Sequence, residues 1–522
     1  MRNGVAVVFA VLIVLSSVGP AVATGQQPAA IDTGQQVAPQ RDDPDEDVIG
    51  WEGGYWHDES IDINQSDGLT DEEVDAYVAR AMARVEYLRQ EEFESEVPVE
   101  VLSRSEFQQR SSENATSNAS YDAWNDQVWE ALFVIGEDQG ANSALQGATG
   151  QTTAGFYAPS DDRIRIITDS PDSPTIDNAT LVHELVHALQ DQSGDLGERI
   201  SSAETQDADL ATDGVVEGEA NYIEAQYTDR CGVEWECVST PSDGDGAGQP
   251  PNLGILLTLL HPYSDGPAYI HDLYQEGGWD AVDAAFADPP ESTEQIIHQT
   301  DAEPTPIAFE DRAREGWETF PAQGENGSDT VGEASMYVMF WYQARTSGAN
   351  RNLANSLFRT SGEYDMYNYD AEPSAGWGND RVFPYQRTAA GETQYGYVWV
   401  TEWDSERDAT QFVEAYRAIL DAHDATERNG THVIPNGEFA DAFRIDRDGT
   451  RVTIVNGPTP TAVRQIRPAE AADGNSSGGS TATAAPGEPT DGSTGLEAPG
   501  FGALTAILAV IGAVAVLARR RA

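Results

Sequence analysis

The sequence predicts an α+β fold in which a mainly helical core, with one strand ahead of its central helix, is followed by a small mixed α/β lobe. Three observations lead to this prediction: an apolar helix over residues 176–192, a second helical stretch over 213–227, and alternating strands after residue 394. The 522 residues are 39% hydrophobic and include 11 Trp, 19 Tyr and 15 Phe. Disordered acidic chains lack so many aromatic side chains, so we expect a folded core.

Charge restricts the partners of this chain. It has 29 basic and 89 acidic side chains, a net charge of −60, and no lysine. Such a surface repels polyphosphates and anionic lipids, so nucleic acid is excluded as a partner held by bulk charge. In about 1 M salt the Debye length falls to about 3 Å, which screens the repulsion among the acidic groups. The composition is therefore typical of a halophilic protein.

The first 23 residues have the order of a secretory signal peptide. Arg2 precedes an apolar run over residues 5–18, and the small residues 21–23 follow. We expect cleavage after residue 23 and export of the chain, and a retained signal anchor is the alternative. Residues 24–68 are predicted to be a flexible lead-in, because residues 24–50 are similar in composition to a Gly-, Ser-, Thr- and Pro-rich stalk near the C-terminus.

The helix over residues 176–192 carries the chemistry. Its apolar residues recur at helical spacing, and His183 and His187 stand four residues apart, so both imidazoles point toward one place, as two ligands of Zn²⁺ must. Glu184 is placed to act on a metal-bound water, which completes the HExxH pattern of zinc hydrolases. The alternative is a pair of core histidines bonded to backbone carbonyls, which would bury Glu184 at a cost of several kcal/mol unless it is paired.

A third protein ligand is needed, and the helical stretch over 213–227 offers Glu217 and Glu219. Gln190 and Ser193 stand where metzincins require Gly and His, which excludes that class. The pattern Glu-Gly-Glu-Ala from residue 217 resembles the gluzincins, in which a Glu on a later helix is the third ligand. The resemblance implies Glu217, with Glu219 as the alternative, and we expect the other carboxylate to hydrogen-bond a histidine.

The strand predicted over residues 163–167 lies just ahead of the HExxH helix. In zincins, which this arrangement resembles, such a strand provides the edge that pairs with an extended substrate. An oxyanion partner is also expected. The candidates, which the sequence does not rank, are Tyr222, His261, His271, His298 and Arg381.

The only two cysteines, Cys231 and Cys237, sit in one short segment. Outside the cell they predict a local disulfide. The alternative is half of a metal site, which no further cysteine could complete.

Helical and aromatic segments continue over residues 253–298 and 333–342. Several of their motifs are similar to those of a widespread group of secreted or membrane-tethered HExxH proteins of bacteria and archaea. The resemblance spans about 150–465 and implies a zincin-like, metallopeptidase-like fold. The motifs that carry it are at 262–266, 277–279, 289–295, 376–381 and 403–405.

The C-terminal lobe is expected to belong to the same unit as the metal helices. A strand is predicted over 394–402, a helix over 409–423, and two strands around an Asp-Gly turn over 443–456. We therefore divide the folded part into a zincin-like catalytic region over 69–325 and a lobe over 326–466.

The C-terminal end predicts a surface tether. Residues 467–498, rich in Gly, Ser, Thr and Pro, have the composition of a stalk. Residues 499–522 begin with Pro-Gly-Phe, continue as an uncharged run and end in an arginine cluster, and so resemble the PGF-CTERM sorting signal of archaeal surface proteins. The resemblance implies that an archaeosortase replaces this segment by a lipid, and a retained anchor helix is the alternative. Either places the body at the extracellular face of the membrane.

Together these features predict a surface-tethered zinc metallopeptidase with peptide or protein substrates. Zn²⁺ would lower the pKa of a bound water toward about 7, and Glu184 would act as the general base. One alternative is a non-catalytic surface binding or structural protein on a zincin fold, and another is a zinc amidohydrolase that acts on non-peptide substrates.

Overall fold

The computed structural model describes most of the chain between the predicted signal peptide and the predicted tail. It describes residues 43–114, 118–149, 153–240, 252–360 and 362–468. The predicted signal peptide, the predicted tail and nearly all of the stalk lie outside these ranges. Within the described ranges, no helix has both the length and the hydropathy needed to cross a bilayer.

Helices dominate the first two thirds of the described chain. The described α-helices are α1 Asp71–Arg89, α2 Arg104–Asn114, α3 Ala119–Ala131, α4 Ala141–Thr149, α5 Asn178–Gly194, α6 Leu196–Ile200, α7 Gln206–Arg230, α8 Leu253–Gly277, α9 Trp279–Ala287, α10 Thr293–His298, α11 Gly332–Thr346, α12 Glu406–Ala422 and α13 Pro460–Ile466. Short 3-10 helices are η1 Gln65–Asp67, η2 Pro159–Asp161, η3 Arg351–Leu353 and η4 Ser356–Phe358.

The strands form three separate sheets in the described ranges. Their order is β1-β2 in the first, β3-β5-β4 in the second and β6-β7-β8-β12-β11-β10-β9 in the third. The strands are β1 Trp51–Glu52, β2 Tyr55–Trp56, β3 Val99–Ser103, β4 Gly155–Ala158, β5 Arg163–Thr168, β6 Glu318–Thr319, β7 Trp377–Ala389, β8 Glu392–Trp403, β9 Thr426–Arg428, β10 Thr431–Val433, β11 Ala442–Asp448 and β12 Arg451–Gly457.

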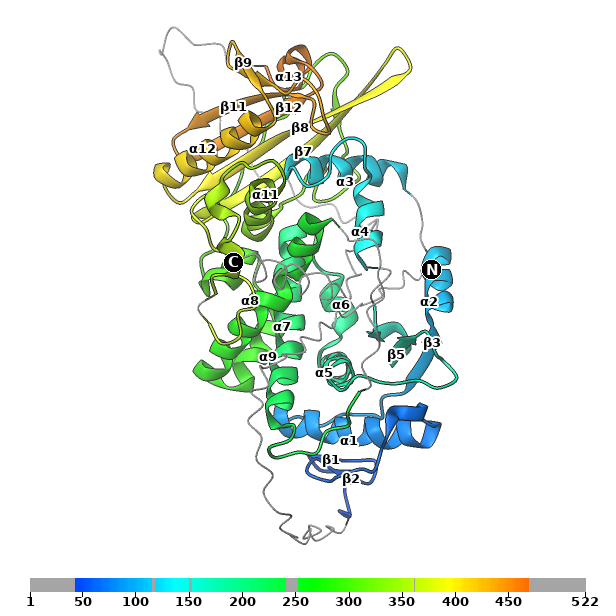
Figure 1. Cartoon of the computed structure of the whole chain (residues 1–522). Coiled ribbons are helices and arrows are strands. Elements are labelled where there is room, and N and C mark those ends of the chain that lie inside the picture. The colour runs from blue at the N-terminus through cyan, green and yellow to red at the C-terminus, as the bar shows by residue number, and fades with distance from the viewer. Residues whose placement is uncertain (1–42, 115–117, 150–152, 241–251, 361, 469–522) are drawn as a thin grey trace, which may run out of the picture.

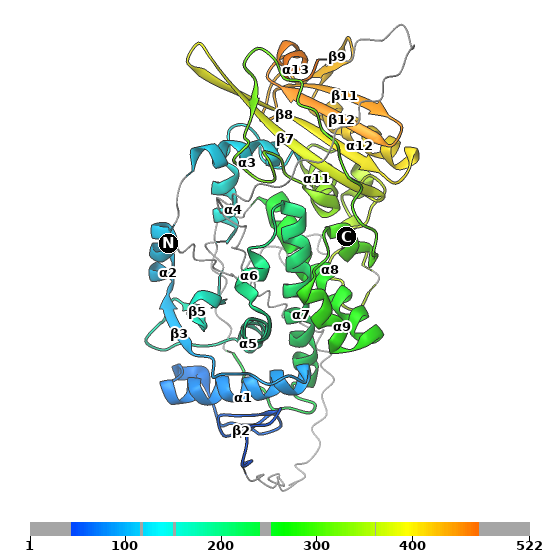
Figure 2. The same ribbon diagram turned by 180° about the vertical axis from the view of Figure 1, so that it is seen from behind.

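These elements stack in three tiers (Figure 1, and from behind in Figure 2). The seven-stranded sheet forms one end, α5, α7, α8 and α9 form the middle, and α1 with the β1-β2 hairpin forms the other end. The predicted helices over 176–192 and 213–227 correspond to α5 and to the centre of α7. Both begin at side-chain caps, because Asp177 and Thr205 accept hydrogen bonds from the first free backbone N–H groups.

Helices α7 and α8 approach so closely that only glycine fits at their crossing. A Cβ atom on Gly218 would lie 2.6 Å from the carbonyl carbon of Gly266, and one on Gly266 would lie 2.4 Å from the carbonyl oxygen of Gly214. Backbone atoms cannot move aside as a side chain can. The crossing therefore determines the position of Glu217, the neighbour of Gly218.

The predicted strand ahead of α5 is β5, but it does not provide a free edge. It pairs with β3 in parallel on one side and with β4 antiparallel on the other. The prediction that this strand is the edge was wrong, because β4, whose four residues are all buried, continues the sheet. The edge that faces α5 belongs to β4.

The C-terminal sheet is antiparallel and covered on both faces. Strand β8 alternates between the two faces, since Val398 and Val400 pack in the cluster that contains α13, whereas Trp399 packs in the cluster that contains α12. The predicted Asp-Gly hairpin is β11-β12, with Gly449 in the turn at φ +63°. The sheet includes β7, which the sequence analysis did not predict.

The apolar core does not divide at residue 326, where the lobe was predicted to start. One cluster of buried side chains joins Trp129 of α3 and Leu256 of α8 to Trp399 of the sheet. The sheet itself begins earlier, with β6, and Phe309 stacks on Phe383 at 3.7 Å between ring centroids. The C-terminal sheet thus shares its core with α3, α8 and α11, whereas α5 and α7 pack with α1 in a separate cluster.

The predicted flexible lead-in over 24–68 is wrong for its second half. Gly50 donates a backbone hydrogen bond of 2.9 Å to Glu86 Oε2 of α1, and the buried Gln65 exchanges two hydrogen bonds with the backbone of Ile176, of 3.0 and 2.7 Å. Two-residue strands and side-chain contacts to a distant backbone leave no periodic signal in the sequence. The segment therefore looked unstructured although it folds onto α1 and the start of α5.

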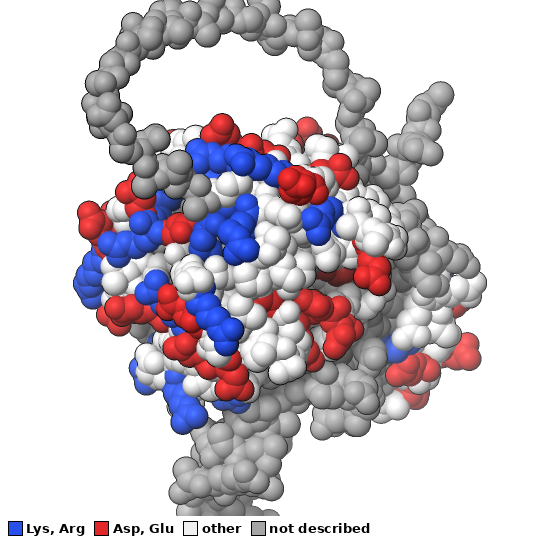
Figure 3. All heavy atoms as spheres, turned by 90° about the horizontal axis from the view of Figure 1, so that it is seen from above, with Lys and Arg blue, Asp and Glu red and all other residues white. Residues whose placement is uncertain are grey.

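The outer face of the C-terminal sheet mixes charges of both signs (Figure 3). The basic groups of the chain are all arginines, and some on the sheet are paired with acids, as in Arg444 with Asp446 at 2.7 Å. Exposed pairs of this kind each contribute at most about 1 kcal/mol to stability. This face is therefore less uniformly acidic than the net charge of the chain suggests.

Candidate metal centre

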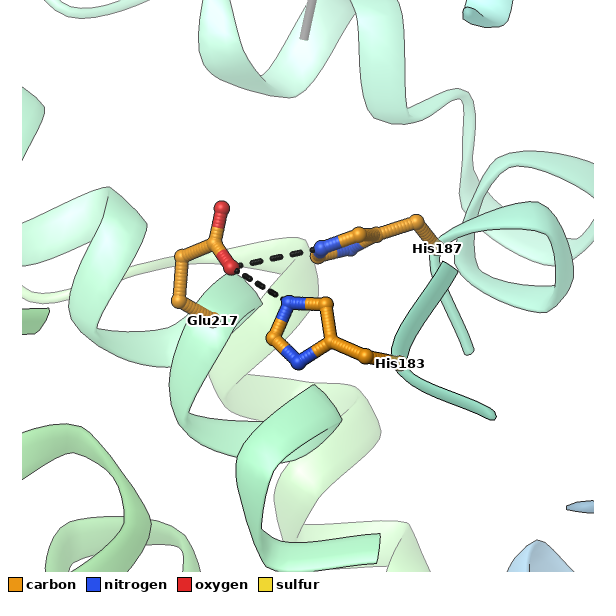
Figure 4. Close-up of side chains that lie close together, drawn as sticks. All are labelled: His183, His187 and Glu217. Carbon is orange, nitrogen blue, oxygen red and sulfur yellow. Dashed lines mark hydrogen bonds and ion pairs between the residues drawn. The ribbon is translucent and has the colours of Figure 1, made fainter. Parts of the chain in front are cut away.

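Three side chains from two helices converge on one point (Figure 4). His183 and His187 project from one face of α5, and Glu217 projects from α7. Glu217 Oε2 lies 3.0 Å from His183 Nε2 and 3.3 Å from His187 Nε2. Both histidines are 0% exposed and Glu217 is 4% exposed. Two imidazole nitrogens and one carboxylate oxygen are a donor set that Zn²⁺ accepts.

A glutamine sets the orientation of His187. Gln190 Nε2 donates to the carbonyl oxygen of Val216 at 3.0 Å and to Glu219 Oε2 at 2.9 Å. Because both of these partners are acceptors, the amide oxygen is the group that faces His187 Nδ1, at 2.8 Å. Nδ1 therefore carries a proton in the neutral ring, and the lone pair of Nε2 points toward Glu217.

A carboxylate lies beside the corresponding nitrogen of His183. Glu224 Oε2 lies 3.5 Å from His183 Nδ1, within ion-pair distance. Glu224 was not among the predicted site residues. Glu224 follows Glu217 by seven residues, which is two helical turns. The 3.6-residue period of α7 therefore places both on one face, and this signal could have identified Glu224.

Glu219 does not hydrogen-bond a histidine, contrary to the prediction for the carboxylate that is not a ligand. It reaches His187 only through Gln190, and its other oxygen accepts a 2.5 Å hydrogen bond from Arg89 Nε. The Arg89 guanidinium also lies over the ring of Trp279, 4.5 Å from its centroid. An arginine from α1 therefore balances the charge of Glu219, and Glu219 contacts the site only through Gln190.

Glu184 is held by one of its two oxygens. The backbone N–H of Tyr157, on the free edge of β4, donates to Glu184 Oε2 at 2.8 Å. Within the described residues, Glu184 Oε1 is buried and has no hydrogen-bond partner. Burial raises the pKa of Glu184 to about 7, so that this carboxyl can both accept and release a proton near neutrality.

The electrostatics of the three converging groups favour a cation between them. Burial raises the pKa of Glu217, but the two histidines outweigh it and lower the pKa to about 2. Burial likewise lowers the pKa of His183, but hydrogen bonds to Glu217 and Glu224 reverse the effect and raise the pKa to about 10. A divalent cation competes with these protons for the same atoms, because metal ligands bind deprotonated.

Whether a metal fits this site can be judged from the buried polar atoms that lack hydrogen bonds. Within the described residues, His187 Nε2 and Glu184 Oε1 are fully buried and hydrogen-bond to nothing, although His187 Nε2 faces Glu217. Such atoms carry a desolvation cost of about 1–3 kcal/mol each unless a ligand satisfies them. The residues therefore fit a tetrahedral ion with two nitrogen ligands and one oxygen ligand.

None of the five oxyanion candidates joins this site. In the described part of the chain, no hydrogen bond or ion pair links any of them to the HExxH residues or to Glu217. His271 pairs with Tyr222, His298 with Glu333, and Arg381 with Glu325, while His261 is buried against Tyr369. The ring that does lie beside His183 is Tyr263 of α8, nearly parallel to it at 6.3 Å between centroids.

The predicted disulfide is confirmed. Cys231 and Cys237 are bonded and close a short loop at the end of α7. The alternative, half of a metal site, was therefore wrong.

Comparisons with known proteins concern the C-terminal sheet. Residues 318–467 match a family model described as a domain of unknown function, DUF8575. This stretch runs from β6 to the end of α13 and leaves α5 and α7 outside. The chain has no significant match among curated proteins or solved structures.

Proposed function

We propose that this protein is a zinc-dependent metallopeptidase exported to the cell surface. The observation that carries the proposal is the convergence of His183, His187 and Glu217, with the outer nitrogen of each imidazole facing its own acceptor. Two unrelated core histidines would not require a carboxylate that faces both of their Nε2 atoms. The resemblance of the HExxH helix to gluzincins supports the same assignment.

The ligands would be His183 Nε2, His187 Nε2 and Glu217 Oε2, and zinc bound there would polarise a peptide carbonyl and lower the pKa of a water molecule. Glu184 Oε1 is the atom placed to take the proton of the attacking water, because Oε2 is held by Tyr157 N–H. Glu184 then returns that proton to the leaving amine, which its pKa near neutrality permits.

The free edge of β4 is the proposed docking site for the peptide. Tyr157 is paired with Ile164 of β5, yet its N–H points away from β5 to Glu184. In an antiparallel ladder every second residue points its backbone groups outward in this way, so Gly155 has the same orientation. An extended peptide added to this edge would run past Glu184.

The proposed location narrows the substrates to proteins near the envelope. The predicted signal peptide and tail would export the chain and tether it, with an archaeosortase-type enzyme as a processing partner and the membrane or a lipid as the anchor. The acidic composition suits activity in high salt.

The burial of the site favours a second candidate function. His183, Glu184 and His187 are each 0% exposed, so a peptide bond reaches them only after the surrounding segments separate. Structural zinc sites are closed to solvent, whereas catalytic sites keep an open position. The second candidate is therefore a non-catalytic surface protein in which zinc stabilises the contact between α5 and α7.

Glu184→Gln separates the two candidates. For a peptidase, the zinc-loaded full-length chain in high salt cleaves a mixed peptide pool, and Glu184→Gln retains one zinc and loses at least about 10²-fold of the rate. His183→Ala loses the zinc, whereas His432→Ala on β10 retains it as the matched control. A wild type that binds one zinc and cleaves no peptide supports the structural role, and absence of zinc binding refutes both.

A further inference from the structure

A second group of side chains lies between α3 and the C-terminal sheet. Glu130 is near the end of α3, Glu137 is in the loop that follows, and Asp441 precedes β11. One carboxylate oxygen from each lies within 4.8 Å of the other two. Glu130 and Asp441 are 5% and 4% exposed, and Glu137 is exposed to solvent.

Buried oxygen atoms without hydrogen bonds surround this group. In the described residues, Glu130 Oε1 and Asp441 Oδ1 have no hydrogen-bond partner. Each carboxylate has one amide neighbour: Gln127 Nε2 donates to Glu130 Oε2 at 2.6 Å, and Asn456 Nδ2 donates to Asp441 Oδ2 at 2.8 Å. The amide oxygens of Gln127 and Asn456 are also buried without a partner. Four acceptors thus lack a donor.

The negative charges of this group are not balanced by protein cations. No arginine or histidine of the described chain forms an ion pair with Glu130, Glu137 or Asp441. Burial, together with Asp441 and Glu137, raises the pKa of Glu130 well above its usual range, as expected for carboxylates that repel one another. The group formed by His298, Glu333 and Asp370 differs, because there the His298 imidazole lies 2.9 Å from Glu333 and supplies the opposite charge.

We infer that Glu130, Glu137 and Asp441 bind Ca²⁺, with the amide oxygens of Gln127 and Asn456 as candidate additional ligands. Ca²⁺ takes six to eight oxygen ligands at about 2.3–2.6 Å. Oxygens up to 4.8 Å apart can therefore lie on opposite sides of one ion. The described donor set contains neither nitrogen nor sulfur, which disfavours zinc, and Mg²⁺ usually keeps several waters instead of binding in an all-protein cage.

The ion would join two parts of the chain that are more than 300 residues apart in sequence. The loop after α3 already contacts the segment before β11, because Glu137 N–H donates to the carbonyl oxygen of Glu438 at 2.9 Å. Phe133 packs on Phe439 with 4.8 Å between ring centroids. Ca²⁺ at this point would hold the C-terminal sheet onto α3, independently of the proposed zinc centre.

The test is calcium-dependent stability of the zinc-loaded full-length chain in high salt. At Ca²⁺ about 100-fold above its Kd, we expect Tm to rise by about 3 °C, and calorimetric titration with CaCl₂ to show one site that Mg²⁺ does not fill. Glu130→Gln and Asp441→Asn should abolish both effects. Glu414→Gln, which removes an exposed acid on α12, should preserve them and is the matched control.

The change in stability of these variants without calcium also has an expected sign. Removing one of three unbalanced carboxylates relieves repulsion, so Glu130→Gln without Ca²⁺ should be at least as stable as the wild type, and it should therefore fold. A Tm of the wild type that does not respond to Ca²⁺ overturns the inference, since the carboxyls are then simply protonated. A calcium response that survives in both variants overturns it as well.

Discussion

Gln190 offers the sharpest test of how the second layer of residues supports the candidate metal centre. It makes three buried hydrogen bonds, to His187 Nδ1, to Val216 O and to Glu219 Oε2. Gln190→Leu keeps the approximate volume and removes all three. His187 Nδ1 then loses its acceptor, and the ring can rotate or change its tautomer.

The magnitude follows from these contacts. A buried polar group left without a partner costs about 1–3 kcal/mol, and the variant leaves His187 Nδ1 and the Val216 carbonyl in that state. Glu219 keeps Arg89 as a donor, so its loss is smaller. We therefore expect the free energy of unfolding to fall by about 2–4 kcal/mol. Loss of such support for a metal ligand typically weakens metal binding 10–100-fold.

Competition with a chromophoric zinc chelator in high salt measures the affinity, and denaturant unfolding of the metal-loaded chain measures stability. Gln192→Leu is the matched control on the same helix, since Gln192 also makes three hydrogen bonds, to the backbone of Glu94 and Ser95. The control should leave the zinc affinity unchanged. Wild-type zinc affinity in Gln190→Leu would refute the reasoning, because the hydrogen bond to His187 would then serve packing alone.

Two further predictions concern buried positions that are not themselves metal ligands. Burial raises the pKa of Asp207 from 3.8 to about 8 in the fold, so the folded state binds more protons than the unfolded state and the free energy of unfolding falls as pH rises from about 4 to 8. Asp207→Asn cannot titrate, and its stability should fall less over this window; equal slopes in denaturant unfolding at each pH would contradict this. Gly218→Ala places a Cβ atom 2.6 Å from the backbone of Gly266, so we expect a loss of about 1–3 kcal/mol and weaker zinc binding, while Gly147→Ala, with open space around it, should retain both. Wild-type melting and zinc affinity in Gly218→Ala would show that α7 and α8 can separate without cost.

Local physics explains most of what the sequence predicted correctly. Helix α5 has its apolar spacing, its Asp177 cap and two histidines one turn apart, all within 18 consecutive residues. The bond between Cys231 and Cys237 and the hairpin around Gly449 are likewise short-range. Residues that are near one another in sequence need no knowledge of the rest of the fold.

The choice between Glu217 and Glu219 could not be made in that way. Both lie near the apolar side of α7, and which of them faces α5 depends on how α7 is rotated against α8 at the Gly218–Gly266 contact. Arg89 on α1 and Tyr157 on β4 reach the site from segments 130 and 27 residues away from the side chains they bind. The lead-in was misread for the same reason.

The sequence by itself thus determined the HExxH helix, its companion helix, the disulfide and the charge of the chain, because periodicity, capping and composition are local properties. The tertiary structure decided which carboxylate meets the histidines, which strand has the free edge and which acids lie together between α3 and the C-terminal sheet. Those features depend on long-range packing, where a displacement of one residue turns a side chain to another face, and no local pattern records it.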